Sequence, residues 1–148
     1  MSASALKTNS RLLIVDDSDD DVFLLTRALR KSGIPNSIDC AANGAQGINY
    51  LQAHVADSER GSELPCMVLL DLKMPIVDGH EVLTWIRSQP SLQNLPVYIL
   101  SSSQLEIDIA KSKEAGAADF WVKPSSLPEY LDLAVRIKAL LPPAVPSA

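Results

Sequence analysis

The chain has 148 residues, enough for one compact domain and too few for two, and 47% of them are apolar. Its formal net charge is -5 and its 13 basic residues form no run, which argues against binding to a nucleic-acid backbone. The longest apolar stretch, around residues 64–72, is far too short to cross a membrane.

Five short apolar runs alternate along the chain with longer segments of helical spacing. The runs cover residues 12–15, 37–41, 66–70, 96–100 and 118–122. Most are apolar throughout, which is typical of strands that are buried on both faces of a parallel sheet. Cys40 and Cys66 lie in two of these runs without metal-type spacing, so we expect buried free thiols, with a disulfide as the less favoured alternative.

The segments between the first four runs carry apolar residues three or four positions apart, as helices do. These apolar stripes consist of Val22, Leu25, Ala28 and Leu29; of Ala45, Ile48, Leu51 and Val55; and of Val82, Leu83 and Ile86. Stop signals follow each stripe. The first helix should end before Gly33, the second before a polar stretch over 56–63, and the third near Pro90.

Two further helices are predicted in the last third of the chain. The first covers residues 105–115, has a weak apolar stripe, and ends at Gly116. The second begins after Ser126, because Glu129 three positions later gives the spacing of a capping box and Pro128 suits a first helical turn. Its apolar residues are Tyr130, Ala134, Ile137 and Leu141.

The domain is expected to cover residues 11–141, with a flexible tail at 1–10 and a short proline-rich tail at 142–148. The first tail lacks the apolar segment of a signal peptide, so a cytoplasmic location is expected by default. Strands and helices that alternate five times predict a parallel sheet with helices on both faces. In such sheets the functional residues lie beyond the carboxyl ends of the strands.

Polar residues follow four of the five predicted strands. Asp16 and Asp17 follow the first strand, Asp71 follows the third, Ser101 follows the fourth, and Lys123 follows the fifth. Asp16 and Asp17 alone are interpreted equally well as solvated acids at a helix start. The prediction of a site therefore depends on the conjunction of all four strand ends.

Carboxylates gathered at one edge repel one another, so at neutral pH they need a cation or must take up protons. Carboxylate oxygens are the ligands that Mg²⁺ prefers, and the bound ion readily accepts phosphate oxygens. We therefore predict that Asp71 is a nucleophile that forms an aspartyl phosphate, with Lys123 and Ser101 in contact with the phosphoryl oxygens. The acids at residues 19–21 are expected to stay solvated at a helix N-terminus, without a chemical role.

The segment over residues 70–79, Leu-Asp-Leu-Lys-Met-Pro-Ile-Val-Asp-Gly, closely resembles the phosphoacceptor loop of two-component response-regulator receiver domains. The resemblance also includes Asp16 and Asp17, the hydroxyl of Ser101 and the pair Lys123-Pro124. It covers nearly the whole chain. It implies an α/β, flavodoxin-like, doubly wound fold: a five-stranded parallel sheet of strand order 2-1-3-4-5 with five helices.

The resemblance also implies a role for each matching residue around a bound Mg²⁺. Asp17 and Asp71 would bind the ion directly, and Asp16 would act mainly through water. Lys73 would offer its backbone carbonyl to the ion, and Lys123 would contact the phosphoryl group. The protein would take part in its own phosphorylation and dephosphorylation without being a conventional enzyme.

The resemblance further implies that phosphorylation would draw the Ser101 hydroxyl inward, and that an aromatic residue three positions before the lysine, here Phe120, would rotate into the vacated space. Phe120 lacks the hydroxyl found in commoner members, and we expect it to be partly exposed in the resting state. The bond between Lys123 and Pro124 is commonly cis in the family. Neighbours such as Lys73 and Ser103 influence how fast the phosphoryl group is hydrolysed.

The implied phosphoryl donor is a sensor histidine kinase or a phosphotransfer protein. The polar stretch over 54–65 and the Ser-Ser-Ser-Gln loop are similar to those of single-domain regulators paired with bacterial phytochromes and hybrid kinases. Because only seven residues follow Leu141, we expect no output domain. The signal would leave through the face formed by the helix from Leu105, the strand that holds Phe120, and the last helix, by binding a downstream protein or by forming a homodimer.

Three other functions are compatible with parts of this pattern. Haloacid dehalogenase-like phosphatases also form an aspartyl phosphate, but they carry a second Asp two residues after the nucleophile, where this chain has Lys73. A nucleotide- or flavin-binding domain is disfavoured because the first strand leads into acids and not into a glycine-rich loop. A phosphorylation-independent adaptor on the same fold is the main alternative.

Overall fold

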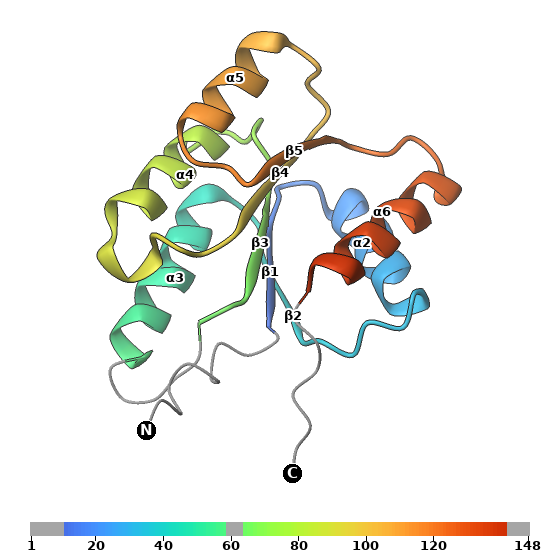
Figure 1. Ribbon diagram of the computed structural model, residues 1–148, viewed down its shortest axis with the longest axis horizontal. Helices are drawn as coiled ribbons and strands as arrows, with labels where there is room; N and C mark the ends of the chain where they lie inside the picture. The colour runs from blue at the N-terminus through green and yellow to red at the C-terminus, as the bar shows by residue number, and fades with distance from the viewer. Residues whose placement is uncertain (1–10, 59–63, 142–148) are drawn as a thin grey trace.

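The computed structural model describes residues 11–58 and 64–141 (Figure 1), so the tails predicted at 1–10 and 142–148 lie outside the described residues. Five parallel strands form a single sheet: β1 (Leu12–Val15), β2 (Ile38–Ala41), β3 (Met67–Leu70), β4 (Val97–Ser101) and β5 (Asp119–Val122). Their order is β2-β1-β3-β4-β5, which confirms the doubly wound, flavodoxin-like topology expected from the resemblance.

The described residues contain five α-helices, as expected, and one short 3₁₀ helix. They are α2 (Asp19–Lys31), α3 (Gly44–Ser58), α4 (Gly79–Ser88), α5 (Glu106–Glu114) and α6 (Leu127–Leu140), with η1 (Pro90–Leu92) after α4. Figure 1 shows α2 and α6 on one face of the sheet and α3, α4 and α5 on the other. The polar stretch expected from residue 56 is helical at its start, because α3 continues through Ser58.

The sheet is buried from both sides because its central strands alternate between two apolar clusters. Leu13 and Val15 of β1 pack toward α3 and α4, whereas Leu12 and Ile14 pack toward α2 and α6. The edge strand β2 departs from this pattern, since its Cys40 is exposed and free. The expectation of two buried cysteines is therefore wrong for Cys40, and Cys66 is only half-buried. An edge strand has a neighbour on one side only, so its outer residues reach solvent.

Local hydrogen bonds explain where two of the helices begin. Asp78 and Glu81 form a reciprocal capping box at α4, with backbone-to-carboxylate distances of 3.0 and 3.2 Å. At α6, Ser126 accepts a hydrogen bond from the Glu129 N–H at 3.3 Å, as predicted. The Glu129 carboxylate instead accepts from the backbone N–H of Ser125 at 2.7 Å, so the expected box at α6 is only half formed.

Gly79, the first residue of α4, lies against the backbone that follows β3. Its N–H donates to the Leu72 carbonyl at 2.9 Å. A Cβ atom here would lie 2.3 Å from the Asp71 carbonyl oxygen and 2.7 Å from Leu72 Cα, far inside van der Waals contact. Only glycine lets α4 approach so closely, and this approach fixes the backbone that carries Asp71.

We predict that Gly79→Ala lowers the free energy of unfolding by about 2–3 kcal/mol, because the backbone of Asp71 and Leu72 must move to make room for the methyl group. Chemical denaturation monitored by circular dichroism measures the change. Thr84→Ala, at an exposed position of the same helix, is the control and should change stability by less than about 0.5 kcal/mol. Equal effects of the two substitutions would contradict the assigned role of Gly79.

Candidate functional site

Three carboxylates meet at the carboxyl edge of the sheet. Asp16 and Asp17 follow β1, and Asp71 follows the neighbouring strand β3. Ligand oxygens of the three side chains all lie within 4.8 Å of one another. Asp16 and Asp71 are only 6% and 4% exposed, whereas Asp17 is exposed. The structure therefore brings together the acids that the strand-end pattern singled out.

Lys123, directly after β5, supplies a positive charge to this cluster. Its Nζ lies 3.0 Å from Asp16 Oδ2, 2.7 Å from Asp21 Oδ2 and 3.6 Å from Asp71 Oδ2. The lysine side chain is 12% exposed, so these interactions occur largely out of water. A charge in this position can neutralise an anionic group attached to Asp71.

Asp21 lies beside the carboxylate cluster, and its ion pair with Lys123 corrects the expectation that the acids at residues 19–21 stay solvated. It is the third residue of α2, and its N–H donates to Ser18 Oγ at 3.3 Å. This orientation directs its carboxylate to Lys123, and the Tyr130 hydroxyl lies 3.5 Å from the other carboxylate oxygen. The sequence contains three consecutive acids, and only the direction in which α2 points each side chain brings Asp21 to Lys123.

The charges shift the pKa values of the buried members of the cluster. Burial, followed by the negative charge of Asp16, raises the pKa of Asp71 to about 7. Burial also raises the pKa of Asp16. Burial alone would lower the pKa of Lys123, but the hydrogen bond with Asp21 and the charges of Asp16 and Asp71 raise it above its ordinary value. One lysine thus compensates the carboxylates only in part.

Ser101 ends β4 and is 0% exposed. Its carbonyl accepts a hydrogen bond from the Lys123 N–H at 2.8 Å, so two of the predicted site residues are joined directly through their backbones. Its Oγ accepts a hydrogen bond from the Ser103 N–H at 3.2 Å. The hydroxyl is therefore engaged with its own loop in this conformation.

Lys73 lies two residues after Asp71, and its side chain extends away from the carboxylate cluster to α5. Its Nζ is 3.1 Å from Asp108 Oδ2, while its backbone N–H acts to lower the pKa of Asp71 against the larger effect of burial. This ion pair with Asp108 is not apparent in the sequence, because 35 positions separate the two residues and the apolar stripe of α5 is weak.

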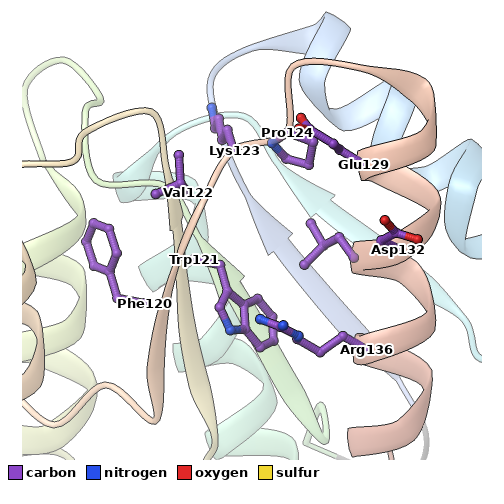
Figure 2. A pocket seen from close by; sticks show the side chains of 9 residues that line it. Phe120, Trp121, Val122, Lys123, Pro124, Glu129, Asp132 and Arg136 are labelled. Carbon is purple, nitrogen blue, oxygen red and sulfur yellow. The ribbon is translucent and has the colours of Figure 1, made fainter.

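Phe120 is half-buried and packs against the cluster on the α3 and α4 face, as expected for the resting state. Figure 2 shows it on the opposite side of β5 from Trp121. Arg136 Cζ lies 5.9 Å from the centroid of the Trp121 ring. The bond between Lys123 and Pro124 is trans, which corrects the expectation of a cis bond. Trans is the ordinary form, favoured by about 0.5–1 kcal/mol in X–Pro bonds.

The donor set fits a hard divalent cation. Three carboxylates within 4.8 Å of one another, two of them buried, provide oxygen ligands and excess negative charge. One side of the cluster stays open to solvent through Asp17. Asp16, Asp17 and Asp71 are therefore the side chains that could hold Mg²⁺.

Comparison with known proteins relates nearly the whole chain to signalling proteins. The sequence profile of the response regulator receiver domain matches residues 12–135. Response regulator Rcp1 from Synechocystis is 30% identical over 128 residues, which make up 86% of each chain. The crystal structure of the Mn²⁺-bound form of Rcp1 has a TM-score of 0.78 at 28% identity and covers 94% of this chain and 99% of that chain.

Two further relatives show the range of proteins that this chain resembles. The structure of the phosphorylated cyanobacterial phytochrome response regulator RcpA has a TM-score of 0.79 at 29% identity and covers 90% of this chain and 94% of that chain. Transcriptional regulatory protein PrrA from Mycobacterium tuberculosis is 35% identical over 134 residues, and the chain spans about half, 51%, of that protein's length. In the described parts of the chain, no helix combines the length and apolar character needed to cross a membrane.

We predict that Asp71→Asn stabilises the protein in the absence of divalent cations by about 1–3 kcal/mol, because it removes a buried carboxylate repelled by its neighbours. Lys123 keeps two closer partners, Asp16 and Asp21, in the variant. Denaturation in the presence of a chelator measures the difference. Asp20→Asn, which removes an exposed acid from the same edge, should give no stabilisation.

Millimolar Mg²⁺ should raise the stability of the parent protein more than that of Asp71→Asn, because a ligand that binds only the folded state stabilises it more the tighter it binds. Equal stabilisation of the two proteins by Mg²⁺ would remove Asp71 from the set of ligands.

Proposed function

This chain belongs to the response regulator receiver domain family, and from that premise we propose that Asp71 accepts a phosphoryl group from the phosphohistidine of a partner kinase. The observation that carries the proposal is the position of Asp71, 4% exposed, with Lys123 Nζ 3.6 Å from its Oδ2 and two further acids beside it. A carboxylate that served only to fill space in the core would not need a lysine and two further acids beside it.

In the proposed reaction, a carboxylate oxygen of Asp71 attacks the phosphorus atom of the donor. A new O–P bond forms, the P–N bond of the phosphohistidine breaks, and the histidine leaves with the bonding electron pair. Lys123, whose Nζ already lies 3.6 Å from Asp71 Oδ2, binds a phosphoryl oxygen. Burial of Asp71 excludes most water from the group, which strengthens the attraction between lysine and phosphoryl oxygen.

We assign the cation ligands as Asp17 and Asp71 directly, Asp16 through water, and the backbone carbonyl of Lys73. Mg²⁺ bound there would neutralise carboxylate charge and stabilise the charge that develops on the transferring group. The fit of the three carboxylates supports this assignment, as does the Mn²⁺-bound form of Rcp1 among the similar structures.

The switch that we propose uses Ser101 and Phe120. A phosphoryl group on Asp71 attracts the Ser101 hydroxyl, which must then give up the hydrogen bond from the Ser103 N–H. Movement of Ser101 opens space beside β5, and Phe120, already half-buried on the neighbouring strand, rotates inward. Burial of a phenyl ring at this point stabilises the switched state through the hydrophobic effect.

The signalling face that we propose consists of α5, β5 and α6. Large apolar side chains are exposed on it, including Ile107 of α5, 65% exposed, and Val122 of β5, 44% exposed. Beside them a groove runs between β5 and α6, and Figure 2 shows its lining from Phe120 to Arg136. A downstream protein or a second copy of the chain would bind this face after the switch.

The phosphoryl donor that we propose is a cytoplasmic histidine kinase or phosphotransfer protein, and a phytochrome or hybrid kinase is the favoured type. The similarity to RcpA, described as a phytochrome response regulator, supports this choice. The reaction is a signalling step at a single residue, so the protein acts as a phosphoacceptor and not as a conventional enzyme.

The test of the phosphoacceptor is incubation with Mg²⁺ and acetyl phosphate, followed by intact-mass measurement. The parent protein should gain one phosphoryl group, because acetyl phosphate supplies a P–O bond of similar reactivity and acetate leaves. Asp71→Asn should gain none. Asp20→Asn, the matched control at an exposed acid, should gain the group like the parent.

A phosphoryl adduct that persists in Asp71→Asn would place the acceptor elsewhere. If no donor, including purified histidine kinases, produces an adduct on the parent protein, the phosphorylation-independent adaptor becomes the better description.

We predict that phosphorylation changes amide hydrogen exchange in α5 and β5 at least threefold, because the rearranged loop after Ser101 lies directly before α5. Mass spectrometry of peptic fragments, with and without acetyl phosphate, measures the change. Fragments from α3, which is not part of the signalling face, serve as the internal reference. Unaltered exchange across the signalling face, together with an unaltered oligomeric state by size-exclusion chromatography, would refute the proposed output.

A further inference from the structure

Helix α5 is attached to the domain by polar residues. Its two buried residues are Asp108 and Ser112, while Ile107 and Ile109 on the same helix are 65% and 38% exposed. Among the acids of the described residues Asp108 is unusual, since it is only 7% exposed although it lies outside the carboxylate cluster. A buried carboxylate is retained only where its partners compensate for lost hydration.

The partners of Asp108 come from the two loops that border the candidate site. Its Oδ2 accepts a hydrogen bond from Ser103 Oγ at 2.6 Å and lies 3.1 Å from Lys73 Nζ. Lys73 belongs to the loop between β3 and α4, and Ser103 to the loop between β4 and α5. We name the three side chains of Asp108, Lys73 and Ser103 the Asp108 clamp.

Both partners of Asp108 also lie beside the site. The Ser103 N–H donates to Ser101 Oγ at 3.2 Å, so Ser103 holds the proposed switch hydroxyl with its backbone and α5 with its side chain. Lys73, two residues after the proposed phosphoacceptor, holds α5 with its ammonium group. Ser101 is thus linked to Asp108 through one intervening residue, Ser103.

A second set of contacts fixes Asp108 on its other side. Its backbone carbonyl accepts from Ser112 Oγ at 2.8 Å, and His80 Nε2 of α4 lies 3.0 Å from the same Ser112 oxygen. The Asp108 carbonyl is also 3.4 Å from His80 Nε2. Asp108 is therefore held against α4 as well as against the two loops.

We propose that Asp108 is a positioning residue that holds Lys73, Ser103 and α5 in the resting arrangement. Phosphorylation then acts on α5 by breaking the contacts of the Asp108 clamp. This inference rests on the proposed function of Asp71. A phosphoryl dianion on Asp71 competes with the Asp108 carboxylate for the Lys73 ammonium. When the Ser101 hydroxyl turns toward the phosphoryl group, the Ser103 N–H loses Ser101 Oγ as its acceptor, and the loop that carries Ser103 shifts. The loops of Lys73 and Ser103 then leave Asp108 together.

The thermodynamic consequence is a coupling between Asp108 and the phosphoryl site. Contacts made only in the resting state oppose the switch, and removing them shifts the population toward the switched state. A ligand that binds the switched state must then bind more tightly, because less of its binding free energy is spent on the conformational change.

The test uses the full chain with Mg²⁺ and beryllium trifluoride, a stable mimic of a phosphoryl group on a carboxylate. Asp108→Asn keeps an oxygen for Ser103 but removes the charge that holds Lys73, so its apparent affinity should be roughly three- to tenfold higher than that of the parent. Isothermal titration calorimetry measures the affinity. An equal or lower affinity of Asp108→Asn would overturn the proposal.

Glu106→Gln is the matched control for a merely structural role of the acid. Glu106 is also in the first turn of α5, so its charge stabilises the helix end as that of Asp108 does, but its side chain is exposed. The affinity of Glu106→Gln for beryllium trifluoride should equal that of the parent protein. If Glu106→Gln matches the gain of Asp108→Asn, the effect belongs to the helix dipole and the clamp is refuted.

Ser103→Ala provides a second variant outside the helix, which keeps the test valid if Asp108→Asn folds poorly. It should raise the affinity in the same direction, and the double variant should show less than the sum of the two single effects, because both remove one network. Full additivity in the double variant would show that the two residues act separately, against the proposal.

Hydrogen exchange of the unphosphorylated protein separates failure of this proposal from failure of the proposed function. The Leu105 N–H donates to Ser103 Oγ at 3.2 Å, so peptides spanning residues 103–109 should exchange at least threefold faster in Asp108→Asn. The same increase is expected in the Asp71→Asn background, where no phosphoryl chemistry is possible. If the mimic binds no variant but exchange rises, Asp71 loses its proposed role and the clamp stands; if exchange is unaltered, the clamp falls.

Discussion

The structure depends on the repulsion between two buried carboxylates and on the lysine that opposes it. Asp16 and Asp71 lie at adjacent strand ends, and burial raises the pKa of both. Lys123 attracts them and Asp21 from the end of β5, which is separated from β1 in the sheet by β3 and β4. The cluster therefore joins strands that do not pair, and it holds an excess of negative charge that a divalent cation would balance.

The rest of the fold serves to keep these charges at one edge. Strands β1 and β3 are apolar along their length and buried on both faces, so their polar groups appear only where each strand ends. Gly79 then brings the first turn of α4 against the backbone of Asp71, at a distance that no side chain would permit. Rigid packing below the cluster and a fixed loop beside it leave the Ser101 loop and α5 as the parts that can rearrange.

Sequence reasoning found the residues whose position follows from strand periodicity. Asp71 and Lys123 each come directly after an apolar run, and strands, once ordered, place such residues at a common edge. It failed for Asp21, because three consecutive acids differ only in the direction that the helix gives them. It also failed for Cys40, since an apolar run does not indicate whether its strand is central or at an edge. Asp108 gave no signal, because its partners are distant in the chain and its helix has only a weak apolar stripe.

The contrast between α5 and α6 indicates which helix can report on the site. Helix α6 buries Tyr130, Leu133, Ala134 and Ile137, and burial of apolar area favours contact regardless of the charge at the sheet edge. Helix α5 buries Asp108 and Ser112 instead, and its attachment depends on hydrogen bonds and one ion pair, whose partners lie in the loops that follow Asp71 and Ser101. Such contacts are directional and can be exchanged for a stronger anion, so a new charge on Asp71 changes the free energy of α5 far more than that of α6.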